Sequence, residues 1–352
     1  MTDASIPQCI PHGTLVPRLV ARSSGFLHLA GKPLNTVLSN DGSRARHTLN
    51  CTLPGAGVEG LTMSTTITSI RHYARPHLTL ACWLSGLLAV VTFVHAAIGA
   101  FFPGIFRDPP MTAGNAQGTA LVILLVAISI LVASMILAVR GSWRAQILWL
   151  GTLGYILYNA VIFAFAVAFN PLFLLYVASL SLSLWSIVVL LIRVNVDEMR
   201  ARFASTMPVR MFAVYAIAAS ALFFATWMGQ IVPAMFESAS PAFLQGTNLL
   251  TSPVHVLDLG FALPLSVLGA VWLWQRKSWG YLLVGLMLSM LTIETASIAV
   301  DQVFGHLNDP TASLDAVPLF VALTLVGLAV VIAYLRYLHS ESGPGAGEGP
   351  GR

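Results

Sequence analysis

Long apolar segments recur along the chain from residue 78 onward, separated by short polar connections. Each segment is close to the ~20 apolar residues that an α-helix needs to cross a bilayer. None alternates apolar and polar residues as the strands of a membrane barrel do. The pattern therefore predicts an all-α integral membrane protein. Its eight transmembrane helices are expected at residues 78–102, 118–139, 145–169, 171–192, 211–232, 254–274, 279–300 and 317–338.

The segments outside these helices have a different character. Residues 1–70 are rich in Pro, Gly, Ser and Arg and have no sustained hydrophobic period, so they are expected to be disordered. They also lack the apolar core of a signal peptide. A sharper hypothesis is that the true start is Met63 and that residues 1–62 are not translated. Residues 339–352 are rich in Gly and Pro and are expected to form a flexible cytoplasmic tail.

The composition narrows the class of protein. Hydrophobic residues make up 57% of the chain and charged residues 9%, whereas soluble domains carry about 25% charged residues. Such sparse charge cannot cover a soluble surface, so the expected partner is the lipid bilayer and not a nucleic acid. Lysine occurs only at Lys32 and Lys277, outside the predicted helices, which argues against a retinal-type Schiff base. The three cysteines form no CxxC pair, which argues against thiol chemistry.

Basic residues alternate between the two sides of the predicted bundle. On one side, Arg107 is the only Arg or Lys in the connections. Short connections rich in Arg and Lys face the cytoplasm, so both termini are expected there, in a multi-pass protein of the bacterial plasma membrane. A bacterial source is also suggested by the abundance of Ala, Gly and Arg. The basic residues of the cytoplasmic side are Arg71, Arg75, Arg140, Arg144, Arg193, Arg200, Arg202, Arg210, Arg276, Lys277 and Arg336.

Capping residues and prolines mark some helix ends. Asn170-Pro171 and Ser252-Pro253 each place a capping side chain before a proline, which is expected at the first helical position. Pro264 falls inside the sixth predicted helix and is expected to kink it.

The two halves of the chain resemble each other. Arg140-Gly141-Ser142-Trp143 matches Arg276-Lys277-Ser278-Trp279, and Pro171-Leu172-Phe173 matches Pro318-Leu319-Phe320. These matches predict a tandem, parallel repeat of a four-helix unit over residues 78–193 and 211–338. On the offset that takes Arg140 to Arg276, Tyr158 aligns with Glu294. The alternative is that short apolar segments match by chance.

Few ionisable residues lie inside the predicted helices, and all of them fall in the outer half. Insertion of an Asp at a helix centre costs about 2.5–3.5 kcal/mol, so such residues are functional candidates. His255 and Asp258 are three residues apart on one helical face. We therefore expect an outward-facing polar pocket that binds an unknown small ligand. Its candidate ligand-binding residues are His95, Asn159, His255, Asp258 and Glu294.

Each candidate also has a structural interpretation. Asp258 lies in the first turns of a helix, where the helix dipole favours a negative charge. His255 could face interfacial water. His95 and Asn159 could hydrogen-bond neighbouring helices. Glu294 is the hardest to explain structurally, because a deep carboxyl group needs a partner or a proton.

Three functions fit these residues. No cofactor is evident, but His95, His255, Asp258 and Glu294 include the ligand types of zinc, so the pocket could hold a divalent metal. Alternatively, Glu294 could be the titrating group of a proton-coupled transporter of small solutes, although the inner half offers no acidic relay. The third interpretation is a non-catalytic scaffold or sensor subunit in which His255 pairs with Asp258 and His95 with Glu294. No catalytic motif is recognised, so an enzyme is not favoured.

Three stretches carry a resemblance to known proteins: Tyr158-Asn159, Asn170 to Tyr176, and Ser252 to Leu259. In these stretches the chain resembles a family of multispanning bacterial membrane proteins to which no activity is assigned. At most, the resemblance covers the part of the chain that follows the N-terminal segment. It implies a membrane-spanning fold and no particular function.

Overall fold

A computed structural model of the chain describes residues 78–339. Within this part, eight helices are long and apolar enough to cross a membrane, and there is no β-strand. The protein is therefore a polytopic, all-α membrane protein, as the apolar pattern predicts. The predictions for residues 1–70, including a start at Met63, for Arg71 and Arg75, and for the tail from residue 340 lie outside the described residues.

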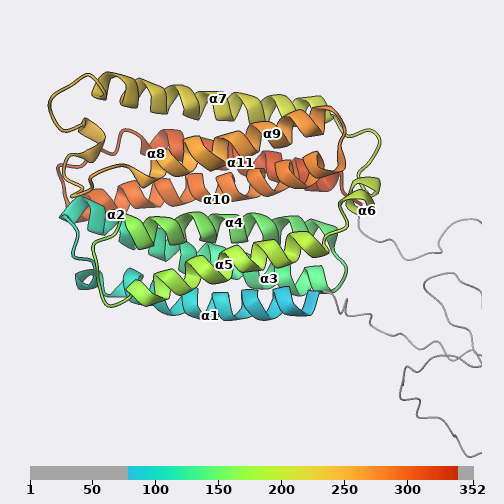
Figure 1. The fold of residues 1–352 in the computed structure, drawn as a ribbon, viewed down its shortest axis with the longest axis horizontal. Coiled ribbons are helices and arrows are strands. Elements are labelled where there is room, and N and C mark those ends of the chain that lie inside the picture. Colours follow the sequence, from blue (N-terminus) through green and yellow to red (C-terminus); the bar gives the residue numbers. More distant parts are fainter. Residues whose placement is uncertain (1–77, 340–352) are drawn as a thin grey trace, which may run out of the picture. The chain divides into compact units, whose positions relative to one another are not determined.

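The spans follow one another through connections of which the longest are residues 194–208 and 235–252 (Figure 1). Two of them, the second and the sixth, are each interrupted by one π-helical turn, η3 and η5. The short helix α6 (Val196–Ala201) links the two halves, and the 3-10 turns η2 (Pro103–Ile105) and η4 (Ala242–Leu244) lie in connections at the other end. The spanning elements are α1 (Thr79–Phe101), α2 (Pro110–Val122) with η3 (Ile123–Ala127) and α3 (Ile128–Val139), α4 (Trp143–Phe165), α5 (Phe173–Arg193), α7 (Val209–Ala234), α8 (Pro253–Leu257) with η5 (Asp258–Ala262) and α9 (Leu263–Trp274), α10 (Ser278–Asn308) and α11 (Val317–Arg336).

Two helices are longer than their apolar segments. The second span begins at Pro110 instead of residue 118, and α10 continues to Asn308 instead of ending at residue 300. The additional turns pack on each other: a Cβ atom on Gly114 would lie 2.3 Å from the backbone oxygen of Phe304. These turns consist largely of polar residues, so hydropathy does not predict them as part of a span. Packing against the neighbouring helix stabilises them.

The two predicted proline starts differ. The Ser252 hydroxyl accepts a hydrogen bond of 3.4 Å from the backbone N–H of His255, and Pro253 is the first residue of α8, which confirms that prediction. The prediction for Pro171 is wrong, because α5 begins at Phe173. The Asn170 side chain instead accepts a hydrogen bond of 2.9 Å from the N–H of Leu172 and holds a turn before the helix.

At Pro264 the sixth span departs from an ordinary α-helix. The π-helical turn Asp258–Ala262 ends two residues before Pro264. A proline lacks the N–H of the usual helical bond and its ring crowds the carbonyl group four residues earlier, and the wider π turn relieves both. The second span carries a π turn without any proline at Ile123–Ala127. The second and the sixth span therefore share this irregularity.

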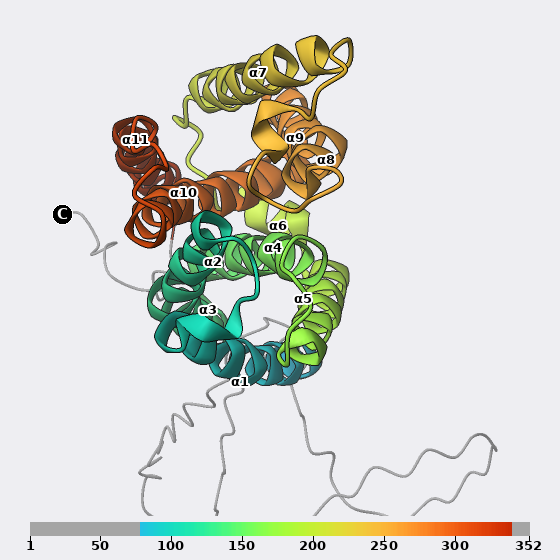
Figure 2. The ribbon, with the colours of Figure 1, turned by 90° about the vertical axis from the view of Figure 1, so that its left-hand side faces the viewer.

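Helices α1 to α5 form a closed bundle. Helix α1 packs along α5 on one side and on α2 and α3 on the other, while α4 packs on α3 and α5 (Figure 2). Hydroxyl groups lie between these helices: Trp149 Nε1 donates to Ser85 Oγ over 3.1 Å, and the hydroxyls of Thr92 and Ser179 are 3.4 Å apart. Small polar side chains thus let the four spans of the first half approach closely.

The four spans of the second half are arranged differently. Helix α7 packs on α9, α9 on α10, and α10 on α11. Helices α7 and α11 touch near the basic connections, where the ring centre of Phe212 lies 5.0 Å from that of Tyr334. Toward the other end α7 diverges from α11 (Figure 2). This half is therefore less closed than the first.

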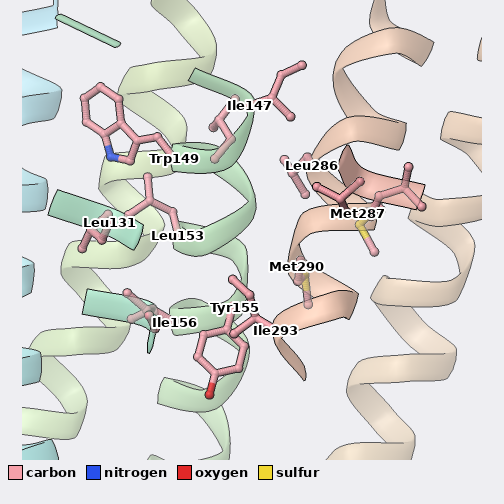
Figure 3. Close-up of a cluster of buried hydrophobic side chains, with 14 of the residues drawn as sticks. Leu131, Ile147, Trp149, Leu153, Tyr155, Ile156, Leu286, Met287, Met290 and Ile293 are labelled. Carbon is pink, nitrogen blue, oxygen red and sulfur yellow. The ribbon is translucent and has the colours of Figure 1, made fainter. Parts of the chain in front are cut away.

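Helices α4 and α10 run side by side through the centre and are the most buried of the eight spans. Apolar side chains of both helices, including Ile147, Leu286 and Met290, meet between them (Figure 3). A Cβ atom on Gly151 would lie 2.5 Å from Ser289 Cβ, so glycine is required for this approach. The contact of α4 with α10 is the core that joins the two halves.

The basic connections gather at one end of the helices. Arg144 Nε donates a hydrogen bond of 2.7 Å to the carbonyl oxygen of Leu338, and the Arg210 guanidinium lies 5.7 Å from the centre of the Trp274 ring. The backbone N–H of His339 bonds to the oxygen of Arg202 over 3.0 Å. The end of α11 is thus fixed to the connections that carry the basic residues.

Candidate functional site

Asp258 is held by neutral donors from two other helices. It begins the π turn η5, six residues after the Ser252 cap. Its Oδ1 accepts a hydrogen bond of 3.1 Å from the Tyr158 hydroxyl on α4, and its Oδ2 accepts one of 2.8 Å from Trp227 Nε1 on α7. Three elements that are distant in sequence therefore meet at this carboxyl group.

Glu294 is held by the residue next to Tyr158. Asn159 Nδ2 donates to Glu294 Oε2 over 2.9 Å and also to the backbone oxygen of Tyr155 over 3.1 Å. The amide is thereby oriented by its own helix and aimed at α10. Consecutive residues of α4 thus bind the two carboxyl groups that the sequence singles out in the second half.

Polar contacts continue along α10 beyond Glu294. The Tyr155 hydroxyl donates to Ser297 Oγ over 3.1 Å, and the Thr119 hydroxyl donates to Asp301 Oδ1 over 2.9 Å. Asp301 is seven residues after Glu294, so its Cα lies about 10 Å further along the helix. A row of polar groups therefore follows the boundary between the two halves toward the end opposite the basic connections.

Among the described residues, no ion pair compensates these carboxyl groups. Within residues 78–339, no Lys, Arg or His side chain forms a salt bridge with Asp258, Glu294 or Asp301. The side-chain donors described above for them are all neutral, and all three residues are partly exposed in the protein. Carboxyl groups in a membrane span normally have a compensating partner, so this lack distinguishes the site from ordinary polar packing.

His255 lies beside the Asp258 site but does not bond to Asp258. Its ring centre is 4.6 Å from that of Trp227 and 4.7 Å from that of Phe243. The residue is only 8% exposed, so little of the ring is open to interfacial water. His255 and Asp258 share Trp227 as a neighbour, and the imidazole packs between the rings of Trp227 and Phe243.

His95 belongs to a different cluster. Its ring packs against Phe163 and Tyr176, with ring centres 5.8 and 5.3 Å away, inside the closed bundle of the first half. Its Nδ1 is buried and has no hydrogen-bond partner among the residues that the structure describes, and the space beside it does not admit a water molecule. The structure therefore separates His95 from the site that contains Asp258 and Glu294.

The candidates do not assemble as a metal centre. Among the described residues, no three His, Cys, Asp or Glu side chains lie close enough together to hold a metal ion. The pairs His255–Asp258 and His95–Glu294, expected for a scaffold, do not form in this part of the chain either, because each of the four side chains has the other neighbours described above. The structure brings together Asn159, Asp258 and Glu294, with His255 at the edge.

Trp227, Thr119 and Ser297 are members of the site that sequence reasoning misses. A tryptophan in an apolar helix is ordinary, and Thr and Ser are common where membrane helices meet. The only available signal is that the indole N–H of a partly buried tryptophan needs an acceptor. Nothing in the sequence identifies Asp258, on another helix, as that acceptor.

The fold and the site define an integral membrane protein with eight α-helical spans in the described part of the chain, whose halves meet at a row of acidic and neutral polar side chains. Comparisons of the chain with protein-family models, with curated proteins and with solved structures found no match.

Proposed function

We propose that the protein binds a small organic cation at Asp258 and Glu294, in the outer half of the membrane. The observation that carries this proposal is the pair of carboxyl groups held by the neutral donors Tyr158, Trp227 and Asn159. Such donors orient a carboxylate without neutralising it. A cationic ligand would supply the missing charge.

The surroundings of Asp258 favour an organic cation over a metal ion. The indole of Trp227, whose Nε1 bonds to Asp258, packs against the ring of His255, which packs against that of Phe243, with ring centres 4.6 and 4.7 Å apart. Aromatic faces attract ammonium groups and accommodate their apolar substituents. A divalent metal would require several ligands around one point, and the described residues offer no such group.

Binding can be tested by the fluorescence of Trp227, because its Nε1 bonds to Asp258. The purified protein is titrated with methylammonium, tetramethylammonium and choline, with neutral neopentyl alcohol as the uncharged control. We expect the cations alone to change the emission, and Trp227→Phe to remove the change. Asp258→Asn and Glu294→Gln should weaken the apparent affinity at least about tenfold, or about 1.4 kcal/mol.

Asp315→Asn is the matched control, because Asp315 is an exposed carboxyl group in the connection before α11. It should leave the titration unchanged. An equal loss in Asp315→Asn and Asp258→Asn would show a general effect of charge and refute the site. An emission that responds to none of the cations would refute the function.

The outer half is assigned by the basic residues. We propose that the end carrying Arg144, Arg202 and Arg210 faces the cytoplasm of a bacterium, since cytoplasmic connections are rich in Arg and Lys. The carboxyl groups then open toward the outside. A single cysteine at Asp315, in a variant without the native cysteines, should react with a membrane-impermeant maleimide in intact cells, whereas one at Lys277 should react only after lysis.

We also propose that residues 78–193 and 211–338 are two copies of a four-helix unit. Three features recur at a single offset: the π turns that begin at Ile123 and Asp258, the left-handed residues Gly141 and Arg276, and the starts of α4 and α10 at Trp143 and Ser278. This structural offset is shorter by one than the offset from Arg140 to Arg276 in the sequence match. It pairs Glu294 with Asn159 instead of Tyr158.

The structural offset pairs positions that contact each other. Asn159 bonds to Glu294, and a Cβ atom on Gly151 would lie 3.0 Å from the backbone oxygen of its counterpart Leu286. Equivalent positions of two copies meet only along a two-fold axis. Since α4 and α10 run in the same direction, this supports an axis parallel to the helices and hence to the membrane normal.

A further inference from the structure

Two turns at the basic end of the helices share one backbone geometry. They are the α3–α4 turn (residues 140–142) and the α9–α10 turn (residues 275–277) (Figure 1). Gly141 and Arg276 each donate the backbone N–H to the carbonyl oxygen three residues earlier, over 3.0 and 2.8 Å. In both turns the next N–H bonds five residues back, over 3.0 and 2.9 Å. Each turn is therefore a helix end closed by a left-handed residue.

The α9–α10 turn carries two residues that do not suit this geometry. The left-handed position favours glycine, which the α3–α4 turn has at Gly141, whereas Arg276 holds a side chain there at a φ of 56°. Ser142 caps α4 by accepting a bond of 3.3 Å from Ala145 N–H, but Lys277, at the corresponding position before α10, makes no capping bond. Local stability is thus lost at two consecutive positions, and both of them carry a cation. Such departures from local preference are typical of functional sites.

A third cation lies beside the α9–α10 turn. Arg210, the second residue of α7, has its guanidinium 5.7 Å from the ring centre of Trp274, the last residue of α9. Arg210, Arg276 and Lys277 are exposed, and so are the rings of Trp274 and Trp279. These five residues form a basic–aromatic patch. Tryptophans at the ends of spans lie at the level of the lipid headgroups, so the patch is at the boundary between bilayer and water.

The protein does not neutralise the charge of this patch. Within residues 78–339, none of its three cations forms a salt bridge. The acidic residues described at this end are Asp197 and Glu198. Glu198 pairs with Arg202 over 3.7 Å, and Asp197 accepts a hydrogen bond from the Ser278 hydroxyl. Three cations beside one neighbouring carboxylate leave an excess of positive charge, so the complementary partner is an anion.

The position of the patch selects among anions. A phospholipid phosphate lies at the level of interfacial tryptophans, and an arginine can bind a phosphate through two N–H groups at once. The patch also adjoins the start of α10, where the helix dipole favours a negative charge. We infer that Arg210, Trp274, Arg276, Lys277 and Trp279 bind the headgroup of an anionic phospholipid.

This site is independent of the proposed cation site. Trp274 is 16 residues after Asp258 on the same span, so the two lie about 24 Å apart along the helix. A variant of one site should therefore leave the other intact.

The test is native mass spectrometry of the full-length protein in detergent, titrated with dioleoyl phosphatidylglycerol or with dioleoyl phosphatidylcholine, which has the same acyl chains and no net charge. We expect one phosphatidylglycerol to bind at least about tenfold more tightly than phosphatidylcholine. Arg276→Gly, which copies the α3–α4 turn, should weaken phosphatidylglycerol binding about fivefold, and Arg276→Gly/Lys277→Ser about 25-fold. Both variants should melt at the same or a higher temperature, because they restore the left-handed glycine and the cap.

Arg140→Gln is the matched control, because Arg140 is an exposed cation in the α3–α4 turn, and it should leave the affinity for phosphatidylglycerol unchanged. The inference is overturned if the wild-type protein binds the two lipids equally, or if Arg140→Gln and Arg276→Gly weaken binding equally. It is also overturned if excess inorganic phosphate displaces the phosphatidylglycerol, since the ligand would then be a soluble phosphate. A wild-type protein that binds the lipid but shows no cation response at Trp227 would refute the proposed function alone.

Discussion

Asn159 on α4 donates a hydrogen bond of 2.9 Å to Glu294 on α10, and the offset between these two residues is the same as that between the starts of the two π turns. One amide and one carboxyl group thus face each other at corresponding places in the two halves. A pair of this kind can be exchanged between the helices with little change of geometry. A contact between unrelated positions has no such property.

The exchange is a direct test of the proposed repeat. Asn159→Glu alone places two carboxyl groups face to face, and Glu294→Asn alone removes the acid. We expect Asn159→Glu to be destabilised by about 1–3 kcal/mol, because the Glu294 acceptor loses its donor. The double variant Asn159→Glu/Glu294→Asn should recover at least half of that loss in thermal unfolding in detergent. A double variant as unstable as the sum of the single changes would contradict equivalence of the two positions.

The crossing of α2 with α10 depends on glycine. A Cβ atom on Gly114 would lie 2.3 Å from the oxygen of Phe304 and 2.8 Å from its carbonyl carbon, both backbone atoms that cannot move aside alone. Gly114→Ala should therefore destabilise the protein by about 1–3 kcal/mol. Gly86→Ala is the control, since a Cβ atom there meets nothing within 4 Å. Equal melting temperatures for the two variants would show that the helices separate without cost.

A substitution of His95 tests whether this residue serves packing or ligand binding. Because its ring lies between Phe163 and Tyr176 and its Nδ1 has no hydrogen-bond partner, His95→Phe should preserve the aromatic contacts and remove a buried polar atom. We expect unchanged or higher thermal stability and an unchanged cation titration. Loss of cation binding in this variant, with stability intact, would place His95 at the ligand after all.

Asp108 lies in the connection between the first two spans. Its surroundings predict that the stability of the protein depends on pH. Its Oδ1 accepts a hydrogen bond of 2.9 Å from Ala168 N–H, and its Oδ2 is buried without a partner in the described part of the chain. Burial raises the pKa of the Asp108 carboxyl above its ordinary value of 3.8, although the bond from Ala168 opposes the shift. The folded protein therefore binds this proton more tightly than the unfolded chain does.

The sign of the effect follows from linkage. The contribution of Asp108 to stability is greatest below pH 3.8 and declines as the pH rises through the higher folded pKa. Asp108→Asn does not titrate and keeps an oxygen for Ala168. The free energy of unfolding of the wild-type protein should thus fall relative to the variant between about pH 4 and neutrality. Parallel stability curves over this range would contradict the prediction.

The apolar pattern alone determines the eight spans, because hydrocarbon requires every backbone group to bond within its own helix and nearly every side chain to be apolar. Because successive spans cross in opposite directions, every second connection lies at the same end. This brings the basic connections from Arg140 to Arg336 to one end. The Ser252 cap is likewise local, since its hydroxyl bonds only three residues ahead. These features need no knowledge of neighbouring helices.

Tertiary structure decides which polar residues meet. His95 and Glu294 look alike in sequence, yet one is enclosed by aromatic rings of the first half and the other bonds to Asn159 across the boundary. Tyr158 and Trp227 reach Asp258 from α4 and α7, and the polar ends of α2 and α10 are helical because they pack on each other. The depth of a side chain in the membrane follows from its distance along its own helix. The residues that it contacts depend on how that helix is rotated relative to its neighbours, and this rotation is set by the packing of the whole bundle.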